Sequence, residues 1–150
     1  MPDLQITSSA FEPMGTIPTE YTCSGKNISP PLAFSGVPAG ASSLALVVDD
    51  PDAEGGPFNH WILYDIPSDV PALPENYTPA AGIKLGQNDF GKLEWNGPCP
   101  PKGQTHQYYF RLYALDLILG LETGLSQAQL MDQIYSHTLA TAQLVGVFGR

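Results

Sequence analysis

Glycine and proline interrupt this chain so often that its apolar segments stay short. The sequence holds 15 residues of each type, about a fifth of its 150 residues. Proline lacks the amide hydrogen that a helix interior or a central strand uses, and glycine favours turns. Because the segments between them are regularly apolar, the composition predicts an ordered, all-β domain with many turns rather than a helical bundle or a disordered chain.

Five apolar segments are expected to be strands: residues 4–7, 43–49, 60–66, 107–116 and 144–148. The segment 43–49 is apolar on both faces, and Pro51 ends it because proline donates no ladder hydrogen bond. Residues 12–38 read as long ordered loops interrupted by short extended pieces, and residues 71–91 read as another loop-rich region. No repeat, low-complexity tract or linker divides the chain, so a single domain over residues 1–150 is predicted.

One clear helix is expected near the C-terminus. Ser126 and Gln129 have the spacing of a capping box, and Leu125 and Leu130 fit the hydrophobic staple that flanks such a box. The apolar spacing that follows predicts a helix ending near Leu139.

Charge and hydropathy exclude several functions. The sequence has only 6 Lys and Arg but 15 Asp and Glu. The resulting net charge of −9 repels nucleic-acid phosphates and anionic membranes. No apolar run approaches the roughly 20 residues of a membrane span. The first five residues lack the features of a signal peptide, so a cytoplasmic location is the default, with a periplasmic one if such a peptide has been removed. Cys23 and Cys99 lack metal-ligand spacing, and the sequence leaves open whether they pair.

Polar residues gather where the predicted strands end. Asp50 and Asp52 lie two apart and, in extended geometry, leave the same side of the chain, with His60 starting the next strand. His106 and Tyr108 are likewise two apart at the start of the aromatic segment 107–116. The rigid segment 97–101, Gly-Pro-Cys-Pro-Pro, lies just upstream and could wall the same cavity.

Each feature also has a purely structural explanation. Asp-Pro-Asp is a common turn sequence, a histidine beside Trp61 is often structural, and Tyr108 could simply pack in the core. The coincidence favours a shared site, because two of the three histidines flank strand ends beside paired polar groups. Imidazole and phenol donate to anions, whereas carboxylates accept from ammonium or hydroxyl groups. The combination suits a ligand such as a phosphoethanolamine head group or a nucleotide.

Four stretches of the chain resemble the phosphatidylethanolamine-binding (Raf kinase inhibitor-like) family. Residues 46–53 (LVVDDPDA), followed by Asn59-His60-Trp61, resemble its first signature, and residues 97–103 (GPCPPKG) with His106 and the following strand resemble its second. Residues 21–32 (YTCSGKNISPPL) and 142–146 (AQLVG) are similar to the bacterial and archaeal branch.

The resemblance implies a Greek-key sandwich of two packed antiparallel sheets with a small anion pocket at one end. The pocket residues that it implies are Asp50, Asp52, Phe58, His60, Gly97, Cys99, Pro100, His106 and Tyr108. Three positions depart from the family pattern. Glu54 stands where a proline is usual, Gln107 where the second signature has arginine, and Phe148 where the final aromatic is often tyrosine. Without that arginine, weaker anion affinity is expected.

The function expected from these residues is a non-enzymatic binding module for a phosphoryl or other small anionic ligand. The resemblance further implies modulation of a kinase or protease partner and homodimers among microbial relatives. No catalytic residue, cofactor or metal is expected. Two alternatives stay open: a small hydrolase using His60 or His106 with Asp50, and a metal site of two His and two Asp.

Overall fold

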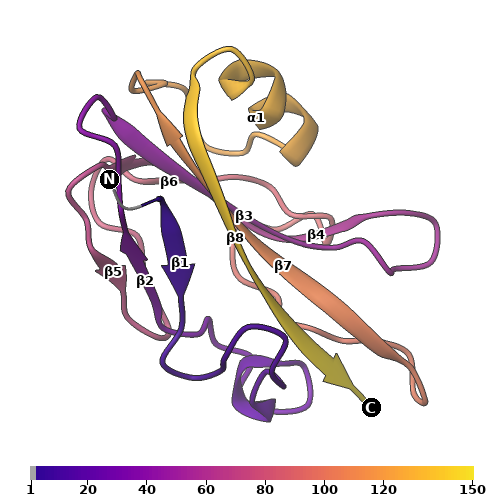
Figure 1. Cartoon of the computed structure of the whole chain (residues 1–150). Coiled ribbons are helices and arrows are strands. Elements are labelled where there is room, and N and C mark those ends of the chain that lie inside the picture. The colour runs from indigo at the N-terminus through magenta and orange to yellow at the C-terminus, as the bar shows by residue number, and fades with distance from the viewer. Residues whose placement is uncertain (1–2) are drawn as a thin grey trace.

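The computed structural model describes residues 3–150 and contains two antiparallel sheets and one short α-helix, which confirms the expected all-β class (Figure 1). The elements are β1 (Gln5–Thr7), the 3-10 turn η1 (Thr19–Tyr21), β2 (Leu32–Ser35), β3 (Ser43–Asp50), β4 (Phe58–Pro67), β5 (Ala72–Leu73), β6 (Lys84–Leu85), β7 (Thr105–Leu115), α1 (Gln127–Ile134) and β8 (Thr138–Gly149).

The smaller sheet has the order β1-β2-β5 and the larger one the order β6-β4-β3-β7-β8. In the larger sheet, β7 returns after a long connection and lies beside β3, which is the neighbour relation of a Greek key. Between β4 and β6 the chain crosses to the smaller sheet to form β5. The topology therefore interlocks the two sheets.

The central strand β3 separates two apolar layers, and all eight of its residues are buried. Leu44, Leu46 and Val48 belong to the core shared with the smaller sheet, whereas Ala45 and Val47 belong to a second cluster that includes Leu130 and Ile134 of α1. Because side chains alternate along a strand, the continuous apolar segment 43–49 supplies both layers at once. The helix covers the face of the large sheet opposite the small sheet (Figure 1).

Helix α1 begins as predicted but ends earlier. Ser126 accepts from the amide of Gln129, and the Gln129 side chain accepts from the amide of Ser126, so the capping box is formed. The predicted end near Leu139 is wrong: the helix ends at Ile134, and the hydroxyl of Thr138 donates to the Ile134 carbonyl. From Thr138 onward the chain pairs with β7, because alternation over residues 138–149 favours a strand. The final strand is thus longer than the predicted segment 144–148.

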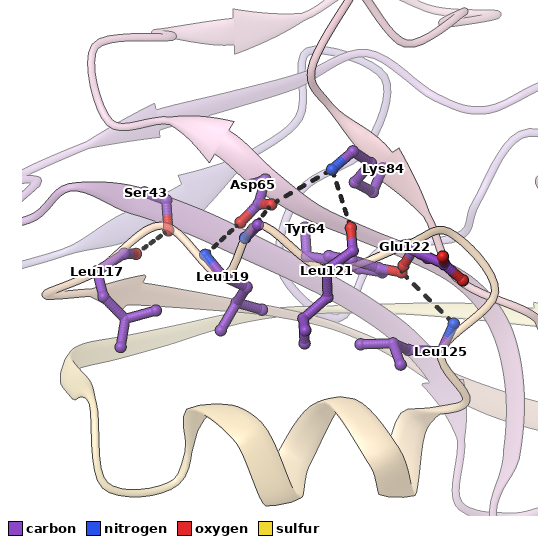
Figure 2. A network of polar contacts seen from close by, with 10 residues as sticks. Ser43, Tyr64, Asp65, Lys84, Leu117, Leu119, Leu121, Glu122 and Leu125 are labelled. Carbon is purple, nitrogen blue, oxygen red and sulfur yellow. Dashed lines mark hydrogen bonds and ion pairs between the residues drawn. The ribbon is translucent and has the colours of Figure 1, made fainter.

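A buried aspartate anchors the loop that leads into α1 (Figure 2). Asp65 accepts from the amides of Leu119 and Gly120, and the Lys84 ammonium lies 3.7 Å from its carboxylate. Asp65 has a φ of +55°, a left-handed conformation that aspartate tolerates better than most residues. The Tyr64 hydroxyl donates to the Glu122 carbonyl nearby. These contacts hold the loop 117–125 against β4 and β6.

Within residues 3–150, no helix has the length and apolar character needed to cross a bilayer.

Candidate functional site

The ends of β3 and β7 bring together three of the residues that the sequence singled out. Asp50 is the last residue of β3, and His106 and Tyr108 start β7, its neighbour in the sheet. His106 Nδ1 lies 2.7 Å from Asp50 Oδ2, and both side chains are almost fully buried. His106 Nε2 lies 2.9 Å from Oε1 of Gln104. Both ring nitrogens thus lie within hydrogen-bond distance of side-chain oxygens.

A β-bulge in β4 turns His60 toward the same side. Val48 pairs with Trp61 and Asp49 pairs with Asn59, so His60 is an extra residue without a partner on β3. A bulge interrupts the alternation of a strand and redirects a side chain. His60 consequently lines the cavity with Asp50, while the next residue, Trp61, belongs to the core between the sheets.

These side chains surround a cavity of about 270 Å³. Seven of the nine residues implied by the family resemblance line it: Asp50, Phe58, His60, Cys99, Pro100, His106 and Tyr108. Four further lining residues are Ala53, Glu54, Phe90 and Pro101. Phe90 had no signal in the sequence, because it lies in the long loop 71–91 and reaches the site only through the fold. Its ring packs edge-on against Phe58 at 4.9 Å and against His60 at 5.5 Å.

Two of the implied residues lie outside the cavity lining. The Asp52 carboxylate accepts from the Gln107 amide at 2.9 Å, and its own amide donates to Asp50, so it ties β7 to the turn after β3. Gly97 packs so closely on the Tyr21 carbonyl that a Cβ there would lie 2.2 Å from the oxygen. Both residues support the neighbours that line the cavity.

The proline-rich wall of the cavity is joined to the N-terminal loop. Cys99 and Cys23 form a disulfide, which answers the question that the sequence left open. Gly97 donates to the Asn27 side chain, and the Pro98 carbonyl accepts from the Cys23 amide. Arg150 donates to the Pro100 carbonyl. Because prolines have no amide hydrogen, these few bonds and the disulfide hold the wall in place.

Burial sets the protonation of two groups in the cavity. It lowers the pKa of His60 below 6.5, so the ring is neutral near pH 7. His60 Nδ1 lies 2.6 Å from the Asn96 carbonyl and donates to it, which leaves Nε2 as an acceptor. Burial, reinforced by the charge of Asp50, raises the pKa of the Tyr108 phenol. Its hydroxyl makes no hydrogen bond of normal geometry among residues 3–150, although the residue is only 1% exposed; its nearest polar neighbours are the Cys99 main chain and the Asp50 carboxylate.

The charges of the site are unusual for an anion pocket. Asp50 and Glu54 line it, whereas no lysine or arginine does. Arg111 lies on the opposite face of the sheet, where its guanidinium donates to both oxygens of Asp49. Across the described chain, no three His, Cys, Asp or Glu side chains are grouped so that they could hold a metal ion.

The phosphatidylethanolamine-binding protein family model matches residues 7–149. The chain belongs to this family. A relative from Methanothermobacter thermautotrophicus, described only as a UPF0098 protein, is 46% identical over 98% of this chain and 99% of its own length. Another UPF0098 protein, from Aquifex aeolicus, is 41% identical over 98% of this chain and 89% of its own.

Solved structures of family members share the whole fold. A putative phosphatidylethanolamine-binding protein homologue from Chlamydia trachomatis superposes with a TM-score of 0.95 at 40% identity, covering 100% of this chain and 99% of that one. Escherichia coli YbcL, described as a member of the mammalian family, gives a TM-score of 0.92 at 32% identity, covering 99% of both chains. The family membership that the sequence resemblance implied is therefore confirmed.

Proposed function

We propose that this protein is a binding module whose cavity holds a small phosphoryl ligand that also carries an ammonium group, such as a phosphoethanolamine head. The observation that carries the proposal is the Tyr108 side chain, which lines the cavity while its buried hydroxyl makes no hydrogen bond of normal geometry among residues 3–150. A buried polar group without a partner costs about 1–3 kcal/mol, and a ligand oxygen that accepts from it would remove that cost.

The two ends of such a ligand have different partners in the cavity. Tyr108 and His106 supply donors for phosphoryl oxygens, with the oxygen replacing Gln104 at His106 Nε2. The neutral His60 Nε2 and the carboxylates of Asp50 and Glu54 accept from an ammonium group. The rings of Phe58 and Phe90 add an apolar wall that attracts a cation. Because no lysine or arginine lines the cavity, a bare phosphate is expected to bind more weakly than the zwitterion.

The hydrolase alternative has less support than the binding role. Asp50 and His106 have the geometry of a base with an orienting carboxylate, but covalent catalysis would also need a nucleophilic side chain beside them. Cys99, the cysteine that lines the cavity, has no free thiol because its sulfur is bonded to Cys23. The binding role therefore accounts for more of the site.

Modulation of a kinase or protease, which the family resemblance implies, would be an additional role, with the exposed Phe90 at the cavity rim as its point of contact.

An NMR titration tests the proposal. Phosphoethanolamine is added while the imidazole signals of the three histidines are followed, with inorganic phosphate and ethanolamine as separate controls. The signals of His60 and His106 should move together and saturate at lower concentration with phosphoethanolamine than with either control. His137 lies outside the cavity and should not move. Unmoved His60 and His106 signals would refute the proposed site.

A matched pair of variants separates the cavity from general effects. Tyr108→Phe removes the unpartnered hydroxyl and should weaken phosphoethanolamine binding about tenfold, the effect of one hydrogen bond to a charged group. Tyr113→Phe makes the same change on the helix face of the sheet and should leave the affinity unchanged. Equal affinities in both variants would remove Tyr108 from the proposed site.

A further inference from the structure

The final strand, β8, forms one edge of the larger sheet and pairs with β7 (Figure 1). The C-terminal half of this edge is covered by the N-terminal loop. Both main-chain groups of Val147 bond to residues 15–17, and the Val145 carbonyl accepts from the Met14 amide. Outside the ladder with β7, no main-chain hydrogen bond among residues 3–150 reaches residues 138–144. The first half of the edge is therefore open.

The register of β8 shows which main-chain groups this leaves unpaired. In an antiparallel ladder, successive residues direct their N–H and C=O groups alternately toward and away from the neighbouring strand. The groups of Val145 and Val147 that bond to the loop point away from β7. The register is unbroken over residues 140–149, so Thr141 and Gln143 point the same way. Both residues are exposed, and four main-chain groups thus face outward along the edge without a partner among residues 3–150.

This open edge lacks the features that normally protect one. Exposed edges are usually interrupted by charged residues, prolines or bulges, because unpaired main-chain groups otherwise bind another strand. The whole of β8, Thr138–Gly149, contains no charged residue and no proline. Its register with β7 shifts only at Leu139, at the far end of the open half. The alternating donors and acceptors of such an edge match those of an extended strand.

A two-fold axis at Ala142 lets this edge pair with itself. Antiparallel pairing about that residue sets Thr141 opposite Gln143 of a second copy, and the symmetry repeats the pair. Each pair exchanges two main-chain hydrogen bonds, so all four open groups find partners. No like charges face each other, because the paired segments carry none. An interface of this symmetry closes on itself, so assembly ends at a dimer.

Exposed apolar side chains mark both ends of the open edge. Leu139 is 47% exposed at its start, and Met14 is 55% exposed where the loop begins to cover β8. In the pairing about Ala142, Leu139 lies opposite Val145 of the second copy, the residue to which Met14 of that copy is bonded. The apolar ends of the two copies therefore meet. An unrelated strand would need apolar groups at both ends to make these contacts, whereas a second copy carries them already.

We propose that two copies of this chain dimerise by pairing their β8 edges, antiparallel, into one continuous sheet. The paired residues lie beside Arg111 and Tyr113 of β7. The cavity of the proposed function lies near the other end of β7, at His106 and Tyr108. Dimerisation leaves the cavity of each copy open, so it does not rest on the binding of phosphoethanolamine.

Amide hydrogen exchange tests the interface residue by residue. In the monomer the amides of Thr141 and Gln143 face water, whereas those of Ala140 and Ala142 point toward β7. Raising the purified protein from micromolar to millimolar concentration should slow exchange at Thr141 and Gln143 roughly tenfold or more and leave Ala140 and Ala142 unchanged. Sedimentation velocity over the same range should show the mass rise from one chain to two. A chain that stays monomeric, or a dimer in which Thr141 and Gln143 still exchange rapidly, would overturn the proposal.

A proline variant removes a hydrogen bond of the interface alone. Thr141→Pro deletes an amide hydrogen that points away from β7, so the ladder stays intact, and circular dichroism checks the fold. The variant should raise the Kd of the dimer roughly tenfold or more, since each copy loses one bond of the interface. A folded variant that dimerises as the unaltered chain does would refute the edge pairing.

A matched pair of charge variants tests the same edge without proline. Gln143→Glu adds a carboxylate on each side of the interface and should raise the Kd of the dimer roughly three- to tenfold. Gln133→Glu makes the same change on the exposed surface of α1 and should leave the Kd unchanged. Equal dimer affinities in the two variants would contradict the proposal.

Discussion

His106 Nδ1 lies 2.7 Å from Asp50 Oδ2, with 7% and 5% of the two side chains exposed. The pair joins the end of β3 to the start of β7 and lines the cavity of about 270 Å³. Neither partner can lose the other without leaving a buried polar group unpaired, so the pair both stabilises the fold and shapes the cavity.

Asp50→Ala should therefore be strongly destabilising. Removing one partner of a buried pair costs about 3–5 kcal/mol of the free energy of unfolding, which urea denaturation measures. Asp52→Ala is the matched control, because that carboxylate is exposed and accepts one main-chain hydrogen bond, worth about 1 kcal/mol. Similar losses in the two variants would show that the buried pair has no special weight.

Acid should destabilise the fold partly through His60. Burial lowers its pKa in the folded protein below the ordinary value of 6.5. Between the two pKa values the unfolded chain binds more protons than the folded one, so stability is complete above about pH 6.5 and falls as the pH drops below it. His60→Asn should flatten this part of the curve of unfolding free energy against pH. An NMR titration that gives His60 a pKa above 6.5 in the folded protein would contradict this explanation of the acid sensitivity.

Asp65→Ala should release the loop before α1. The carboxylate accepts from two main-chain amides and lies near Lys84, and alanine tolerates the left-handed backbone poorly (Figure 2). We expect a loss of about 2–4 kcal/mol, the sum of the lost bonds and the backbone strain. Hydrogen exchange of the Leu119 and Gly120 amides should accelerate. Asp65→Asn should lose less free energy of unfolding, because asparagine tolerates the left-handed backbone. If the two variants lose equal amounts, backbone strain contributes nothing to the effect.

Reduction of the disulfide should weaken both stability and ligand binding. The bond spans 76 positions, and closing a loop of this length stabilises a protein by about 4 kcal/mol in the chain-entropy model. Cys99 also lines the cavity that contains His60 and His106, so reduction should raise the Kd for phosphoethanolamine. The Cys23→Ser, Cys99→Ser double variant should resemble the reduced protein and no longer respond to a thiol reductant. A reductant effect that persists in that variant would have another origin.

Local sequence patterns are enough to locate several elements of the fold. Alternation and apolar runs located β3, β4 and β7, and the capping box located the start of α1. The family signatures likewise named most of the residues that line the cavity at the ends of β3 and β7. Such features depend on neighbours a few positions apart, which a single sequence displays.

Features that depend on pairing between distant parts of the chain emerge only when the chain is folded. The bulge that turns His60 into the cavity arises from the register of β3 and β4. Phe90 enters the site from a loop without a periodic pattern, and Cys23 meets Cys99 across 76 positions. The helix ended at Ile134 because Thr138 joins β8 beside β7. Long-range pairing overrides local preference at each of these places, because buried contacts outweigh the small differences in propensity between one backbone conformation and another.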